Sequence, residues 1–313
     1  MALIVSIRTS AVHVIDRFLR TSRRRSRTAV LRRPRAVGRL SCTSGARDRD
    51  VRVLARRVAL VAATLCALPP VGRAATLEEI RERGYLVVAT QDNLPPFEYS
   101  TSRGVIGYDN ELLIGLREAS GLKIRHEVAP LCDVLAGVAS GKYDVAATAL
   151  PVEPHPPPAI VFTAPVAVTS TAYIVRKDND AIRNADDLRG KAIGVQKCSG
   201  LAAASLRASR HSVSRPAGRI IEFDSYADAY QDLVAGRIDA IVGTGASLGA
   251  MARETSGLLH SGVIGAGSLR IAWGVQKDNR DLLHFLNAHL AQQRASGTLA
   301  RLQLKYDLLG NGS

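Results

Sequence analysis

The chain is 313 residues long and carries 42 Lys and Arg against 28 Asp and Glu, a formal net charge of +14. Such an excess ordinarily indicates nucleic acid or an anionic membrane surface as a partner. The charge is uneven, because residues 1–75 hold 17 arginines and three acids, whereas residues 76–313 hold 25 basic and 25 acidic residues. The body is therefore neutral and large enough for one large or two small domains. A nucleic-acid partner has no electrostatic support.

The N-terminal segment has the order of a secretory signal. Arginines at 52–57 precede an apolar run at 58–68, and small residues follow at 72–75. This order predicts a signal peptide at residues 51–74, cleaved near Ala74, and export to the periplasm. The apolar run is too short to span a bilayer.

Residues 1–50 form a basic, Arg-rich extension. We interpret them as a disordered segment upstream of a natural start near Val51, with an organellar transit peptide as the alternative. A lipid anchor at Cys66 is the alternative to simple cleavage, although Thr64 and Leu65 stand where small residues are usual.

The body alternates short apolar runs with amphipathic stretches, which is typical of an α/β architecture with mostly parallel sheets. The first part predicts strands at 85–90, 123–128 and 143–149, a helix from the Asp109-Asn110 cap to Gly121, and a helix at 134–139. The same pattern starts again after the proline-rich stretch 151–158. The second part predicts strands at 172–176, 192–196, 220–223, 238–242 and 270–276, and helices at 201–209, 226–235 (capped by Asp224), 248–254, 280–295 and 298–306.

Seven segments of the body carry a common pattern. They are Tyr85–Thr90 with Asn93–Glu98, Gly107–Leu112, Gly141–Asp144, Phe162–Pro165, Asp187–Gln196, Gly236–Ala240, and Gly274–Lys277 with Ser296–Leu299. In this order and spacing they resemble the family 3 extracellular solute-binding proteins, the periplasmic receptors of polar amino-acid ABC importers. Each segment alone is common in α/β proteins, but seven in register are specific.

The resemblance implies an α/β, two-lobed periplasmic-binding-protein fold of type II. Each lobe is a mostly parallel sheet flanked by helices, and two crossover hinges join the lobes. We place lobe 1 at residues 76–168 plus 272–313 and lobe 2 at 169–271, with crossings near 168–171 and 269–271. The implied function is capture of a small solute by hinge closure, followed by recognition of the closed form by the membrane permease of an ABC transporter. We expect a monomer.

The two usual anchors of α-amino-acid recognition are missing. The resemblance implies an arginine for the α-carboxylate, where this chain has Pro156, and an aspartate for the α-ammonium, where it has Thr244. The predicted ligand-binding residues are Asp92, Leu94, Phe97, Leu131, Glu153 and His155 from lobe 1, and Gln196, Cys198, Ser199 and Thr244 from lobe 2.

Most of these residues have a structural alternative. Ser199 would simply cap a helix, Asp92 would brace a turn, Leu94 and Leu131 would belong to the core, and His155 would be an exposed loop residue. Glu153 and His155 without an arginine favour a neutral or cationic ligand.

Two cysteines, Cys132 and Cys198, remain in the body, and the resemblance places them on opposite rims of the cleft. The preferred interpretation is two separate buried small residues. The alternatives are a disulfide that clamps the cleft shut and a soft metal held by both cysteines and His155. We assign no metal site and no cofactor.

Two further functions stay open. A cleft enzyme of the same fold, such as a dehydratase, would need an acid/base pair, and Asp92 with Glu153 or His155 has no specific spacing. We therefore assign no catalytic residue. An accessory or sensory binding protein is the other alternative.

The balanced charge of residues 76–313 predicts that the exported form focuses near neutral pH, although the full sequence has a pI of about 10.1. Isoelectric focusing of the secreted protein, together with N-terminal sequencing, measures this. A strongly basic focusing point, or an N-terminus upstream of Ala75, would contradict the predicted leader.

Overall fold

The computed structural model describes residues 73–102, 104–152, 157–201, 218–255 and 259–308. Every described helix and strand belongs to one unit, residues 72–313. The predicted extension and nearly all of the predicted signal peptide lie outside the described residues, and so does the helix expected at 201–209, apart from Leu201. Among the described helices, none has the length and apolar character needed to cross a membrane.

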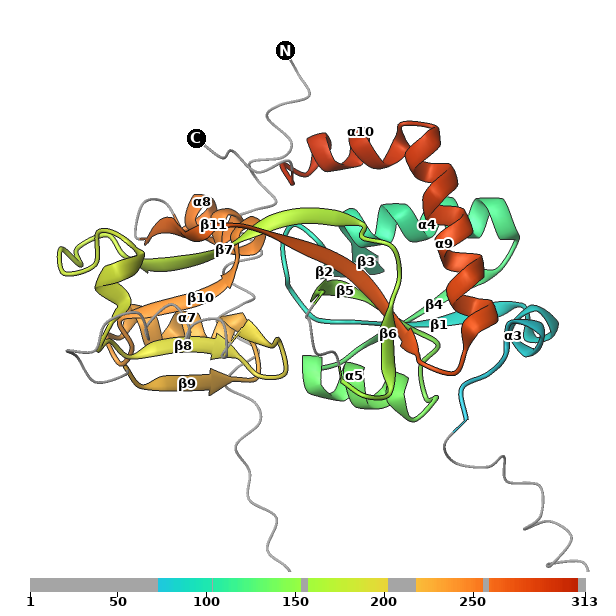
Figure 1. The fold of residues 1–313 in the computed structure, drawn as a ribbon, viewed down its shortest axis with the longest axis horizontal. Helices are drawn as coiled ribbons and strands as arrows, with labels where there is room; N and C mark the ends of the chain where they lie inside the picture. Colours follow the sequence, from blue (N-terminus) through green and yellow to red (C-terminus); the bar gives the residue numbers. More distant parts are fainter. Residues whose placement is uncertain (1–72, 103, 153–156, 202–217, 256–258, 309–313) are drawn as a thin grey trace, which may run out of the picture. The chain divides into compact units, whose positions relative to one another are not determined.

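The first strand group, β4, β1 and β5, is parallel (Figure 1). Its elements are α3 (Leu77–Arg83), β1 (Tyr85–Thr90), β2 (Tyr99–Thr101), β3 (Gly104–Ile106), α4 (Tyr108–Ser120), β4 (Lys123–Val128), α5 (Leu131–Ala139), β5 (Val145–Pro151) and β6 (Ile160–Phe162). The strands predicted at 85–90 and 123–128 are confirmed. The predicted Asp109-Asn110 cap is wrong, because Gly107 is the N-cap of α4.

The second strand group, β10, β8 and β9, is also parallel. Its elements are η2 (Ala185–Leu188), β8 (Ile193–Gln196), β9 (Ile220–Phe223), α7 (Tyr226–Val234), β10 (Ala240–Thr244) and α8 (Gly245–Glu254). Asp224 is not the cap of α7, since the Ser225 side chain accepts from the backbone N–H of Asp228. β10 begins two residues later than predicted, because the backbone N–H of Arg237 donates to the carbonyl of Asp232 at 2.9 Å and extends the preceding turn.

Two antiparallel strands, β7 (Ala167–Arg176) and β11 (Leu259–Gln276), join the two groups. They give the sheet the order β4-β1-β5-β11-β7-β10-β8-β9, with β6 paired to β11. Both strands are longer than predicted. The crossings expected near 168–171 and 269–271 lie within their paired region, where Thr169 faces Leu269 and Val168 faces Arg270.

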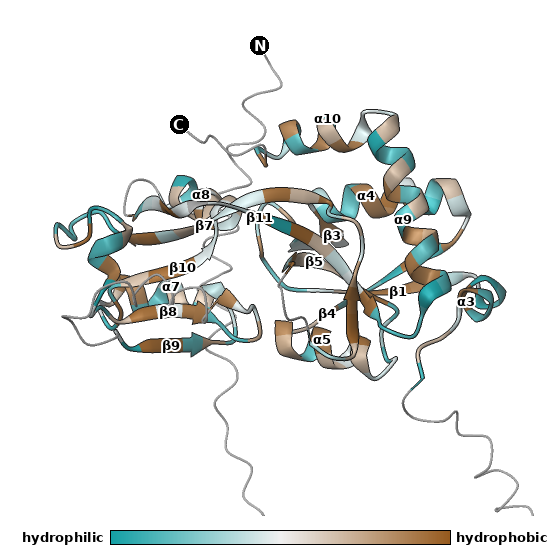
Figure 2. Ribbon diagram, in the orientation of Figure 1, coloured by the Kyte–Doolittle hydropathy of each residue, from teal (hydrophilic) through white to brown (hydrophobic). Residues whose placement is uncertain are grey.

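The main hydrophobic core surrounds Trp273 of β11, whose side chain is fully buried. Phe97 and Tyr108 pack edge to face beside it, with ring centroids 6.1 Å apart. The helices α9 (Arg280–Ala295) and α10 (Thr298–Lys305) contribute leucines to the same core. Figure 2 shows the corresponding pattern in the strands, with β8 and β10 coloured mainly hydrophobic and the surface helix α3 mainly hydrophilic. The helix at 280–295 matches its prediction.

Gly107 allows β3 and α4 to meet the Phe97 segment. Its φ of +124° suits glycine, and a Cβ there would collide with the carbonyl group of Phe97. We expect Gly107→Ala to lower the free energy of unfolding by at least about 2 kcal/mol in urea denaturation. Gly267→Ala is the matched control, because a Cβ at Gly267 meets no atom within 4 Å, and we expect a change within about 0.5 kcal/mol. Equal effects of the two variants would contradict this account.

Candidate functional site

The candidate site lies at the carboxyl ends of the parallel strands, where open α/β sheets bind their ligands. Gln196 is the last residue of β8, Thr244 is the last residue of β10, and Gln91 directly follows β1. These positions bring side chains from both strand groups to one edge. The contacts between them define the site.

A chain of buried hydrogen bonds crosses between the two groups. The Gln196 Nε2 donates to the Gln91 Oε1, and the Gln91 Nε2 donates to the Thr148 Oγ1 at 2.9 Å. The Thr148 hydroxyl donates in turn to the Glu98 Oε1. All four side chains are at most 5% exposed. A buried polar group that lacks a hydrogen-bond partner is costly. This series of hydrogen bonds therefore favours the arrangement in which the two strand groups meet.

This series of hydrogen bonds ends at a buried pair of acids, Glu98 and Asp109. Burial, together with the nearby charge of Asp109, raises the pKa of Glu98 well above its ordinary value. Burial also raises the pKa of Asp109 to about 7, opposed by the hydrogen bond that the Trp273 Nε1 donates to the Asp109 Oδ1 at 2.8 Å. At neutral pH the pair therefore retains protons that exposed carboxyl groups would have lost.

A disulfide joins Cys132 and Cys198, whose Cα atoms are 5.4 Å apart. Cys132 is the second residue of α5, whereas Cys198 follows β8, so the bond links the two strand groups. The preferred interpretation, two separate buried residues, is wrong: Cys198 is exposed and Cys132 half-buried. The soft-metal alternative is wrong as well, because each sulfur is bonded to the other. The two cysteines are 66 positions apart, and this spacing alone does not show whether they meet in the fold, so the sequence could not distinguish these interpretations.

Three predicted wall residues lie in hydrophobic clusters. Leu94 and Phe97 belong to the main core, and Leu131 belongs to a second cluster that packs β1, β5 and α5 together. Their exposed fractions are 4%, 0% and 2%, respectively. In this conformation they contribute to the core, which is the structural alternative for the two leucines.

The predicted hydroxyl residues are buried and make local contacts. The Ser199 Oγ donates to the carbonyl of Gln196 at 2.7 Å. The Thr244 side chain accepts from the backbone N–H of Ser247 at 3.4 Å and caps α8. Asp92 is exposed, and Glu153, His155 and Pro156 lie outside the described residues.

Sequence reasoning missed Gln91 and Thr148. Gln91 stands between a predicted strand and the predicted site residue Asp92, and Thr148 is a polar residue within an otherwise apolar strand. Both positions carried a signal, because a polar side chain at the end of a buried strand or inside one needs a partner.

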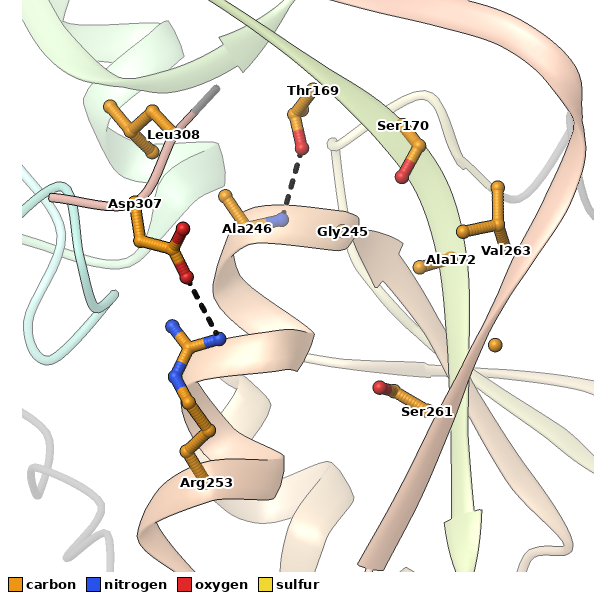
Figure 3. A pocket seen from close by; sticks show the side chains of 11 residues that line it. Thr169, Ser170, Ala172, Gly245, Ala246, Arg253, Ser261, Val263, Asp307 and Leu308 are labelled. Atoms are coloured by element: carbon orange, nitrogen blue, oxygen red, sulfur yellow. Dashed lines mark hydrogen bonds and ion pairs between the residues drawn. The ribbon is translucent and has the colours of Figure 1, made fainter. Parts of the chain in front are cut away.

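A cavity of about 300 Å³ lies beside the crossover strands and α8, and its lining includes none of the predicted site residues (Figure 3). Its lining includes Thr169, whose Oγ1 accepts from the backbone N–H of Ala246 at 3.0 Å. Arg253 of α8 pairs there with Asp307 at 3.4 Å, and both side chains are more than half exposed. Exposed ion pairs of this kind add little stability, so the Arg253–Asp307 pair does not hold the two sides of the cavity in a fixed arrangement.

The model of the bacterial extracellular solute-binding proteins, family 3, matches residues 86–309. The chain therefore belongs to this family. The L-cystine-binding protein TcyJ of Escherichia coli (strain K12) is 29% identical over 234 residues, which cover 74% of this chain and 85% of TcyJ.

Solved structures of amino-acid-binding proteins resemble this chain in fold. A mutant of ArgBP from T. maritima has a TM-score of 0.65 at 26% identity and covers 73% of this chain and 97% of its own. The ancestral amino acid-binding protein AncCDT-1, described as a precursor of cyclohexadienyl dehydratase, has a TM-score of 0.65 at 25% identity and covers 74% and 99%. The predicted two-lobed type II fold and the predicted solute-binding function are confirmed.

The buried acids predict a specific pH dependence. The folded protein keeps a proton on Asp109 up to about pH 7, whereas the unfolded chain loses it near the ordinary value of 3.8. The free energy of unfolding therefore falls as the pH rises through this interval, by up to about 1.4 kcal/mol per pH unit for one proton. The Asp109→Asn variant removes the contribution of this proton to the pH dependence. The side-chain oxygen of the new asparagine can still accept the hydrogen bond from Trp273. We expect a shallower slope in urea denaturation between pH 5 and 7.

The matched control for this measurement is Asp278→Asn, which changes an exposed aspartate just before α9. It should keep the wild-type slope. Parallel curves for the wild type and Asp109→Asn would show that Asp109 does not hold the proton.

Proposed function

We propose that this chain is the periplasmic substrate-binding component of an ABC importer, exported through its N-terminal signal peptide and active as a monomer. It captures an amino acid or a related small polar compound between two lobes, with boundaries near residues 168 and 271. The family match and the amino-acid-binding relatives support this function. The observation that carries it is the meeting of Gln91 and Gln196 at the carboxyl ends of β1 and β8.

The crossover strands supply the hinge for this function. β7 carries the chain from the first strand group to the second, and β11 carries it back. Rotation about these two strands would separate Gln91 from Gln196, and closure would bring them together. A ligand that contacts both groups shifts the equilibrium because it binds the closed form better.

The ligand class follows from the groups at the edge. Gln91 and Gln196 are uncharged amides, and Thr244 stands where an aspartate anchors an ammonium group. The relatives' names point to L-cystine and arginine. Glu153 and His155, with Pro156 where the family resemblance implies a carboxylate-binding arginine, favour a neutral or cationic amino acid over glutamate or aspartate, whose side chains add a second carboxylate.

Ligand titration tests the proposal. The Cys132→Ala/Cys198→Ala variant is used, so that no reductant is present and L-cystine stays intact. We expect L-arginine, L-histidine or L-cystine to raise the melting temperature by mass action, and L-glutamate to leave it unchanged. Calorimetry then gives the affinity.

A second substitution tests the site. Adding Gln196→Ala should weaken binding by about tenfold through loss of one buried hydrogen bond, whereas Gln292→Ala, an exposed change in α9, should leave it unchanged. A flat response to all four amino acids would defeat the importer function. Tight binding of glutamate would defeat the assigned ligand class.

The enzymatic alternative has one observation in its favour, the likeness to a precursor of a dehydratase. That neighbour is itself described as an amino acid-binding protein. Ligand and protein are mixed at equal concentrations, and chromatography shows whether the ligand is converted to a product. Conversion indicates catalysis, whereas unchanged ligand indicates binding alone.

A further inference from the structure

The Cys132–Cys198 bond is a cross-link between two parts that a solute receptor has to separate. One cysteine lies in the first turn of α5, which packs on β1 and β5, and the other lies two residues after the end of β8. A disulfide holds its Cα atoms within about 7 Å of one another, so the halves cannot move apart at this edge while the bond exists. Among the described residues at this edge, Gln196 also contacts Gln91 through a single, reversible hydrogen bond.

The cross-link is also accessible. Cys198 is exposed, with a left-handed backbone at φ of +59°, whereas Cys132 is half-buried. Cys198 is therefore the more accessible of the two residues to a reagent in solution. This order matters because thiol–disulfide exchange depends on which sulfur is attacked and which one leaves.

The leaving sulfur has a favourable position. Cys132 is in the first turn of α5, and the N-cap, Pro130, offers no side-chain hydrogen bond to that turn. The backbone N–H groups there favour departure of the Cys132 sulfur as a thiolate, and the exposed Asp133 of the same turn acts against them.

From these observations we propose that Cys132–Cys198 is a thiol–disulfide exchange site that controls opening of the ligand cleft, with small-molecule thiols as its reactants. The inference rests on the proposed hinge function. With the bond formed, the two strand groups are held closed and solute exchange is blocked. With the bond reduced, the groups separate and the cleft exchanges solute.

The chemistry balances without a further reactant. A small thiolate attacks the Cys198 sulfur, the S–S bond breaks, and the Cys132 sulfur leaves as a thiolate. A second thiolate then attacks the small-molecule sulfur of the mixed disulfide and releases Cys198. Two thiols are oxidised to one small disulfide, the protein disulfide is reduced, and the two protons of the thiols finish on the cysteines.

The first test measures opening without any ligand. Oxidised and glutathione-reduced protein are compared by small-angle X-ray scattering and by deuterium exchange of the amides at the ends of β1 and β8. We expect reduction to increase the radius of gyration and to speed exchange there by about tenfold or more. Cys132→Ala/Cys198→Ala is the matched control: it should resemble the reduced protein and show no response to glutathione.

Other outcomes are decisive. Identical scattering and exchange before and after reduction would overturn the proposal, as would a disulfide that glutathione reduces only in denaturant. Loss of secondary structure on reduction would also overturn it, because the bond would then serve stability. The outcome is independent of the ligand titrations, since failure to bind any amino acid in the cysteine-free variant refutes the proposed function and leaves the opening measurement intact.

The second test measures solute exchange with L-arginine as the probe, or with L-histidine if only that binds to the cysteine-free variant. We expect association with the oxidised wild type to be at least about tenfold slower than with the reduced wild type, because the disulfide holds the cleft closed to the solute. Equal association rates in the two redox states would contradict the proposal.

Discussion

The antiparallel pairing of β7 and β11 is the constraint on which the rest of the molecule depends. It is the place where the chain enters and leaves the second strand group, and it aligns two parallel strand groups that have no direct pairing with each other among the described strands. β11 continues into the first group, where Trp273 is fully buried. The crossover is therefore anchored in a core at one end, which supports the proposed hinge in the paired segment near Thr169 and Leu269.

This anchoring links the hinge to the buried acids. The indole N–H of Trp273 donates to Asp109, and Asp109 lies against Glu98, from which hydrogen bonds lead through Thr148 and Gln91 to Gln196. Each of these groups is buried and polar, so each favours the geometry in which its partner is present. The strand proposed as part of the hinge and the side chain that meets the other strand group thus belong to one polar network.

Local patterns carried much of the fold. β1, β4, β9 and α9 have the predicted bounds because their own residues specify them through apolar runs and polar ends. β11 is different: residues 259–269 are rich in glycine and serine, and their strand conformation comes from pairing with β7. Similarly, Asp109 looked like a helix cap, but its partner is Trp273, 164 positions away. Tertiary partners of this kind leave no local trace.

The site shows the same division. The resemblance located the edge of the sheet and the positions where the usual charged anchors are missing, yet it did not say which side chains meet there. Two contacts join the strand groups, the Gln91–Gln196 hydrogen bond and the Cys132–Cys198 disulfide. They depend on how the two groups, which are far apart in the sequence, are placed in the fold. Spacing in the chain contains no measure of that distance.

The missing anchors and the disulfide bear on one equilibrium. In a hinge receptor, a ligand closes the lobes by as much as its affinity for the closed form exceeds that for the open form. Charged anchors on both lobes would make this difference large, whereas Thr244 and two amides make it smaller. A covalent bond at the same edge holds the closed form without any contribution from the ligand. A weakly anchored cleft with a cross-linked rim is therefore physically consistent, because closure relies on the bond and selectivity on the neutral polar groups beneath it.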